Sequence, residues 1–224
     1  MQQLLQTTHA YEPLRKRHAE VRHSFDDAFS TRITRALSWL ERAEKETEDP
    51  DAGFIFYWIS FNANYSVSFI EGEGISEMAR IKQFLEQIIL CDKSYDIYEI
   101  MWNRFTAEIR GILNNPYIFK EFWKSVFEDS GEDWKADFEK SKKTVNLALS
   151  KQNTLVILHI LFSRLYILRN QLMHGNATWK GEINRRQVTD GYKLISALQP
   201  VFLSLMIENP SRQWGNVNFP RLTR

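Results

Sequence analysis

Residues that break helices are scarce in this sequence, and that scarcity is what most constrains the fold. The 224 residues include nine glycines and six prolines. This is roughly half of what an average usage of about 7% glycine and 5% proline would give. Sandwiches and barrels need turn residues roughly every 8 to 12 positions. The composition therefore disfavours those folds and favours long helices.

Apolar residues recur at helical spacing along most of the chain. The first stripe runs from Phe25 to Leu40, and its spacing predicts a helix with one buried face. Ser76 is expected to cap a later helix, and Gly175 to end another. The sequence predicts an all-α helical bundle with a single domain in residues 25–224, preceded by a basic N-terminal arm or helix in residues 1–24. Similar stripes predict helices at about 51–70, from Ser76 onward, at about 95–113, once or twice within 117–150, at about 154–174 and at about 184–208 with a bend at Pro200.

Cysteine content and hydropathy point to the cytoplasm. Cys91 is the single cysteine, which excludes an intrachain disulfide and fits a reducing compartment. The longest uncharged apolar run, Leu194 to Ile207, is shorter than the 18 to 20 or so residues that a membrane span needs. The N-terminus lacks the apolar core of a signal peptide. We expect a cytoplasmic protein with no membrane partner.

Charge is unevenly distributed, although the formal net charge is only +1. Residues 151–186 hold six lysines and arginines against one glutamate, a net of 6 − 1 = +5, whereas residues 121–140 hold three lysines against seven acidic residues, a net of 3 − 7 = −4. Such segments occur on ordinary solvated surfaces. They also occur where a local basic patch attracts phosphate groups.

Most familiar catalytic motifs are absent, so we expect neither a metal nor another cofactor. The sequence lacks phosphate-binding and dinucleotide-binding glycine loops, the zinc-protease H-E-x-x-H string and the G-x-S-x-G string of serine hydrolases. One candidate remains, an arginine and a histidine spaced as R-x-x-x-x-H, formed by Arg169 and His174. About one arginine five to seven residues before a histidine is expected by chance in such a sequence, and Arg17 lies six residues before His23. Arg169 and His174, however, end the most apolar predicted helix, which would hold them rigidly and expose them.

These residue types suit RNA cleavage through attack of a 2′-hydroxyl on the adjacent phosphate. Histidine can act as the base or the acid near neutral pH, and the forked, always charged arginine can hold the phosphate oxygens. Asn170 lies four residues before His174, on the same helical face, and can orient either Arg169 or His174. The reaction requires two proton transfers, one by a base and one by an acid, and each chain offers a single histidine at this position. A two-fold dimer would supply the second.

The string Arg169-Asn170-x-x-x-His174-Gly175 at the end of a long apolar helix resembles the HEPN superfamily (higher eukaryotes and prokaryotes nucleotide-binding domains). The segment Trp58-Ile-Ser-Phe-Asn-Ala-Asn-Tyr65 is similar to an aromatic W-x-x-F-N-x-x-Y helix of bacterial members. HEPN domains are dimeric helical bundles, and many are metal-independent RNases of toxin–antitoxin, antiviral and RNA-processing systems. The resemblance implies that Arg169 and His174 are catalytic, that Asn170 supports them, and that Asn62 and Tyr65 line the same cleft.

One position departs from the family pattern. Members that a partner nucleotidyltransferase silences often carry a tyrosine two residues after the histidine, and Asn176 stands there in this sequence. Regulation through tyrosine modification at that position is therefore not expected.

The sequence thus predicts a homodimeric, metal-independent endoribonuclease, acting as a toxin or antiviral effector with an antitoxin or defence partner protein. The residues expected to contact RNA are Lys180, Arg185, Arg186 and Arg164. The alternative is a non-catalytic helical dimer that binds RNA or a partner protein. A purely structural interpretation also stands: Arg169 and His174 could stabilise a helix end. The aromatic side chains of Phe54, Tyr57, Trp58, Phe61 and Tyr65 are expected to pack in the core or at the dimer interface rather than stack on bases.

Overall fold

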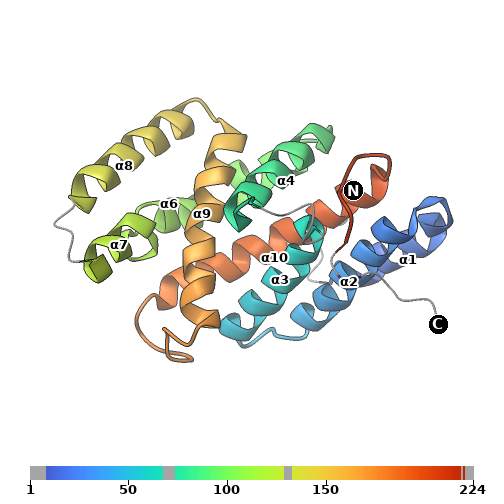
Figure 1. The fold of residues 1–224 in the computed structure, drawn as a ribbon, viewed down its shortest axis with the longest axis horizontal. Helices are drawn as coiled ribbons and strands as arrows, with labels where there is room; N and C mark the ends of the chain where they lie inside the picture. The colour runs from blue at the N-terminus through green and yellow to red at the C-terminus, as the bar shows by residue number, and fades with distance from the viewer. Residues whose placement is uncertain (1–8, 68–73, 129–132, 218, 220–224) are drawn as a thin grey trace.

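The computed structural model describes residues 9–67, 74–128, 133–217 and 219. These residues form helices joined by short loops, with no strand among them, so the all-α prediction is confirmed. Figure 1 shows α7 (Lys120–Glu128) and α8 (Trp134–Ser150) at one end of the elongated molecule and α1 (Tyr11–Val21) and α2 (Asp27–Glu44) at the other. Between them lie α3 (Pro50–Tyr65), α9 (Thr154–Met173) and α10 (Arg185–Glu208).

The first half of the chain forms four helices, and side chains cap three of them: α1 (Tyr11–Val21), α2 (Asp27–Glu44), α3 (Pro50–Tyr65) and α4 (Glu77–Cys91). Asp26, Asp49 and Ser76 each accept hydrogen bonds from backbone N–H groups in the first turn that follows, which satisfies donors that a helix leaves open. The predicted cap at Ser76 is therefore confirmed. α3 ends five residues before the predicted boundary of about 70, since residues 66 and 67 are not helical and residues 68–73 lie outside the described part.

The predicted helix at about 95–113 is wrong as a single element. The chain forms a short α5 (Asp96–Glu99), a π-helical segment (Ile100–Arg104) and α6 (Thr106–Leu113). The N–H of Phe105 donates to the carbonyl of Ile100, five residues earlier, at 3.1 Å, and this wider turn separates α5 from α6. A 3₁₀ turn (Pro116–Ile118) leads into α7 (Lys120–Glu128) and α8 (Trp134–Ser150), and their junction at residues 129–132 lies outside the described part.

The two remaining helices, α9 (Thr154–Met173) and α10 (Arg185–Glu208), match their predicted positions closely. Gly175 has a φ of 69°. The N–H of Asn176 donates to the carbonyl of Gln171 at 2.8 Å, and that of Gly175 to the carbonyl of Leu172 at 3.3 Å. These two bonds define a Schellman ending, in which the left-handed position suits glycine. α10 continues through Pro200.

Aromatic rings from α3, α9 and α10 fill the core. The centroids of Phe61 and Phe162 lie 4.7 Å apart, and both rings lie 6.0 Å from that of Phe202. α3 and α10 approach closely, because a Cβ atom at Gly53 would lie 2.4 Å from Cε2 of Tyr192. The five aromatic residues of α3 that were expected to pack in the core or at a dimer interface, Phe54, Tyr57, Trp58, Phe61 and Tyr65, are all buried.

A buried arginine closes the C-terminal end of α3. Arg32 of α2 is fully buried and donates from Nη1 to the carbonyls of Ala63, Asn64 and Ser66, and from Nη2 to the carbonyl of Gly215. These bonds satisfy carbonyls that the helix end would otherwise leave without donors. Arg32 therefore fastens α2 to both α3 and the C-terminal segment.

The predicted N-terminal arm contains α1, which packs against α2 and α10. The backbone N–H groups of Ala10 and Tyr11 donate to Oε1 of Glu44 at 2.7 and 2.9 Å. Arg17 forms an ion pair with Glu208 at 2.8 Å. These contacts attach the first described residues to the rest of the fold.

In the described part of the chain, α9 is the one helix long and apolar enough to cross a membrane by length and composition alone. Core helices of soluble proteins also meet that test, and α9 packs against α3, α4, α6 and α8.

Candidate active site

Arg169, Asn170 and His174 lie together at the C-terminal end of α9. The backbone N–H of His174 donates to the carbonyl of Asn170 at 3.1 Å, and Nη1 of Arg169 donates to the side-chain oxygen of Asn170 at 2.9 Å. Consecutive helical residues point about 100° apart, so this bond turns the guanidinium toward the face that Asn170 and His174 share. The imidazole of His174 is exposed, whereas Arg169 and Asn170 are half-buried.

A second group of polar side chains lies beside Arg169. Its guanidinium lies 5.9 Å from the ring centroid of Tyr166. The Tyr166 hydroxyl donates to Oε2 of Glu77 at 3.1 Å, and Oε1 of Glu77 lies 2.9 Å from the Tyr65 hydroxyl. The Tyr65 hydroxyl also lies within hydrogen-bonding distance of Asn62. Glu77 thus connects the two residues predicted to line the cleft, Asn62 and Tyr65, to α9.

The two tyrosines are held in their protonated forms. Burial raises the pKa of Tyr65 well above its usual value, and the negative charge of Glu77 raises it further against the opposing charge of Arg169. Burial, followed by the charge of Glu77, also raises the pKa of Tyr166. Both hydroxyls therefore remain donors at neutral pH. The imidazole of His174, by contrast, is exposed.

Lys180, Arg185 and Arg186 lie near the same end of the molecule. The loop between α9 and α10 is fixed by a hydrogen bond from Asn184 to Gln171 at 3.0 Å and by one from Trp179 to Asp49 at 2.8 Å. Lys180 is exposed and lies 4.7 Å from the ring centroid of Trp179, and Arg186 is also exposed.

The predicted RNA contacts differ in how available they are. Arg185 forms an ion pair with buried Asp51 at 2.7 Å, which leaves its guanidinium only partly exposed. Arg164 is buried, with 4% of its surface exposed, and its guanidinium lies 4.1 Å from the ring centroid of Phe119. This burial corrects the expectation that Arg164 shares an RNA-facing surface with Lys180, Arg185 and Arg186.

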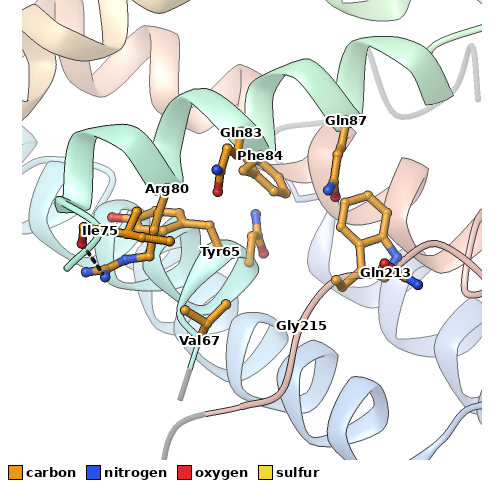
Figure 2. Close-up of a pocket in the computed structure, with 11 residues that line it drawn as sticks. Tyr65, Val67, Ile75, Arg80, Gln83, Phe84, Gln87, Gln213 and Gly215 are labelled. Atoms are coloured by element: carbon orange, nitrogen blue, oxygen red, sulfur yellow. Dashed lines mark hydrogen bonds between the residues drawn. The ribbon is translucent and has the colours of Figure 1, made fainter. Parts of the chain in front are cut away.

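Two cavities adjoin this region. Figure 2 shows the smaller one, of about 190 Å³, into which Gln83, Phe84 and Gln87 extend from α4, with Gln213 of the C-terminal segment and Tyr65 also in the wall. The larger one, of about 630 Å³, is lined by residues that include Asn170, Tyr166 and Glu77. Asn170 is therefore shared between the helix-end group and the larger cavity.

Sequence reasoning missed Glu77, because an acidic residue in the first turn of a helix is common and carries no motif. The described part of the chain holds no group of three or more His, Cys, Asp or Glu residues placed to bind a metal ion. Comparison with known proteins finds no matching family model, curated protein or solved structure.

Proposed function

We propose that this protein is a metal-independent endoribonuclease of the HEPN type that its sequence resembles. The observation that carries the proposal is the arrangement at the end of α9. There, Arg169 donates to Asn170 at 2.9 Å, and the exposed His174 lies one helical turn from Asn170. One helix end thus carries both a guanidinium and an exposed imidazole, the two groups that the reaction needs.

The reaction uses each side chain in a distinct role. Arg169 binds the non-bridging oxygens of the scissile phosphate and stabilises the negative charge that develops on them. His174 takes the proton of the 2′-hydroxyl or gives one to the departing 5′-oxygen. The new bond joins the 2′-oxygen to phosphorus, and the bond to the 5′-oxygen breaks. The products are a 2′,3′-cyclic phosphate and a 5′-hydroxyl.

A homodimer would complete the site. One chain offers a single histidine at this helix end, whereas the reaction needs both a base and an acid. Three apolar side chains within nine residues of His174 in the chain are exposed, Met173 at 45%, Trp179 at 65% and Ile183 at 85%, which is typical of surfaces that bind a partner. A second copy seated on them across a two-fold axis would bring the partner's histidine toward the same phosphate.

Lys180 and Arg186 are the exposed cations that we assign to the RNA backbone. In a plot of the logarithm of the binding constant against the logarithm of the salt concentration, each phosphate contact that is lost makes the slope shallower by about one. We further propose that the protein acts in the cytoplasm as a toxin or antiviral effector, restrained by a partner protein.

The chemistry is tested with two matched RNA substrates that differ by one 2′-deoxy substitution at the cleavage position. In EDTA, the all-ribose substrate should yield a 2′,3′-cyclic phosphate end, and the deoxy substrate should remain intact at that position. Cleavage of the deoxy substrate at the same rate, or cleavage that requires added metal, would contradict the mechanism.

The second candidate function is a non-catalytic helical dimer that binds RNA or a partner protein. The exposed Met173, Trp179 and Ile183 favour it, because they suit an interface whether or not catalysis takes place there. It predicts RNA mobility shifts that persist in His174→Ala, with no cleavage products from either protein.

A further inference from the structure

The larger cavity lies between α9 and the helices α4, α7 and α8. Its volume of about 630 Å³ falls within the range of roughly 300 to 1,000 Å³ that small-molecule sites occupy. Much of its wall is apolar, contributed by Met78, Phe119, Ile160, Tyr166 and Ile167. Such a wall suits an organic molecule with an apolar body.

Arg164 is the buried charge in this wall. Its Nη2 donates to the hydroxyl of Ser141 at 3.1 Å, and its guanidinium lies over the rings of Phe119 and Phe138, at 4.1 and 5.7 Å from their centroids. Its Nε has no hydrogen-bond partner, and no acidic residue in the described ranges forms an ion pair with it. A buried cation without a paired anion is unfavourable.

Burial has a direct effect on this group. It lowers the pKa of Arg164 to about 10, and the nearby charge of Glu121 offsets that effect only in part. The guanidinium therefore stays charged at neutral pH while lacking the ion pair that buried arginines usually have.

Two helix N-termini meet the same cavity. Ser76 and Met78 line it from the start of the 15-residue α4, and Lys120 lines it from the start of α7. The N-terminus of a helix carries partial positive charge and attracts anions. Of the two carboxylates in the wall, Glu77 is held by the hydroxyls of Tyr65 and Tyr166, and the negative charge of Glu121 acts on Arg164 without forming an ion pair with it.

We propose that this cavity binds a small organic anion, with one phosphate or carboxylate group on an apolar or aromatic body. Arg164 and the hydroxyl of Ser141 bind the anionic group, and Phe119, Ile160 and Ile167 contact the body. The site does not depend on the ribonuclease proposal. Because Asn170 lines the cavity and accepts from Arg169, an occupant of this site lies next to the catalytic arginine.

The first test compares probes with the same aromatic body and different charges. Phenyl phosphate and phenylacetate carry the anion, phenylacetamide is neutral and phenethylamine is a cation. We expect one or both anions to bind by calorimetry with a dissociation constant near or below about 1 mM and to raise the melting temperature. Preference between the two identifies phosphate or carboxylate as the group recognised. The proposal is overturned if neither anion binds, or if phenylacetamide binds as well as they do.

The second test places the bound anion on Arg164. Arg164→Met keeps an apolar stem of similar length and should weaken anion binding by about 10-fold or more, because a charge-assisted hydrogen bond is lost. Arg110→Met, at an exposed position of α6, is the matched control and should bind as the wild type does. Ile160→Trp fills the cavity from a position one helical turn before Arg164 on α9 and provides the same readout should Arg164→Met fail to fold. Wild-type affinity in a folded Arg164→Met or Ile160→Trp protein would overturn the proposal, whatever the RNA cleavage assay shows.

Discussion

Arg32 and Arg164 are both buried, with 0% and 4% of their surfaces exposed, yet their surroundings differ. Arg32 lies on the side of the molecule formed by α2, α3 and α10, in the wall of a cavity of about 250 Å³, and it donates to four backbone carbonyls. Arg164 lies on the open side, formed by α4, α7, α8 and α9 around the larger cavity, and donates to one serine hydroxyl. The comparison separates an arginine that supports the fold from one that is left available to a ligand.

The largest effect is expected at Arg32. Arg32→Met leaves buried carbonyls at the end of α3 without their donor and should lower the free energy of unfolding by about 3 kcal/mol. Chemical denaturation measures the change. Arg110→Met serves as the control and should stay within about 0.5 kcal/mol of the wild type. If Arg32→Met lowered the free energy of unfolding as little as Arg110→Met does, Arg32 would not support the fold and would no longer differ from Arg164.

Close packing between α3 and α10 predicts the next largest effect. In Gly53→Ala, the new methyl group would lie 2.4 Å from Cε2 of Tyr192, and such overpacking costs about 1 to 3 kcal/mol. Gly111→Ala is the control, because its nearest neighbour, Oδ2 of Asp190, would lie 3.4 Å away. A Gly-to-Ala change within a helix with room for the methyl group should stabilise by up to about 1 kcal/mol. Equal effects at the two positions in thermal unfolding would contradict the packing described.

A smaller loss is expected for Arg164→Met. It removes a buried charge that has no ion pair, and methionine retains much of the contact with Phe119, so the free energy of unfolding should change by about 1 kcal/mol or less. The same denaturation experiment checks it. A loss as large as that of Arg32→Met would show that Arg164 supports the fold as Arg32 does.

The pH dependence of stability gives a further test of the open side, through His159, which lines the cavity. Burial lowers the pKa of His159, and Glu86, 3.9 Å away, opposes that shift. The unfolded chain therefore takes up a proton at this histidine before the folded chain does as the pH falls. His159 should contribute to a decrease in the free energy of unfolding between about pH 7.5 and 5.5, and His159→Gln should reduce that slope. An unchanged or steeper slope in the variant would contradict this assignment.

Much of the fold could be predicted from the sequence, because the apolar stripes and the residues at helix ends are local signals. Ser76 and Gly175 are the clearest cases, since each meets a conformational need of a single helix end. The π-helical segment between α5 and α6 could not be predicted, because tertiary packing rather than local pattern sets the wider turn.

The candidate site was predictable only in part. The spacing of Arg169, Asn170 and His174 placed them at one helix end, and the resemblance added Asn62 and Tyr65. The hydrogen bonds of Glu77 join residues from three helices. The apolar pattern of any one helix therefore could not predict them. The burial of Arg164 did have a signal, since Leu161 and Leu168 lie three residues before it and four residues after it on the same apolar face.

The central claim is tested most directly by the RNA cleavage rate of His174→Ala in EDTA. The His174 side chain is exposed, so its removal should change the free energy of unfolding by no more than about 0.5 kcal/mol. The matched control is His23→Ala, which removes an exposed histidine of the N-terminal region that also follows an arginine. The account predicts that His174→Ala cleaves RNA at least 100-fold or so more slowly than the wild type, while His23→Ala cleaves at the wild-type rate. Equal cleavage rates for the two variants would contradict it.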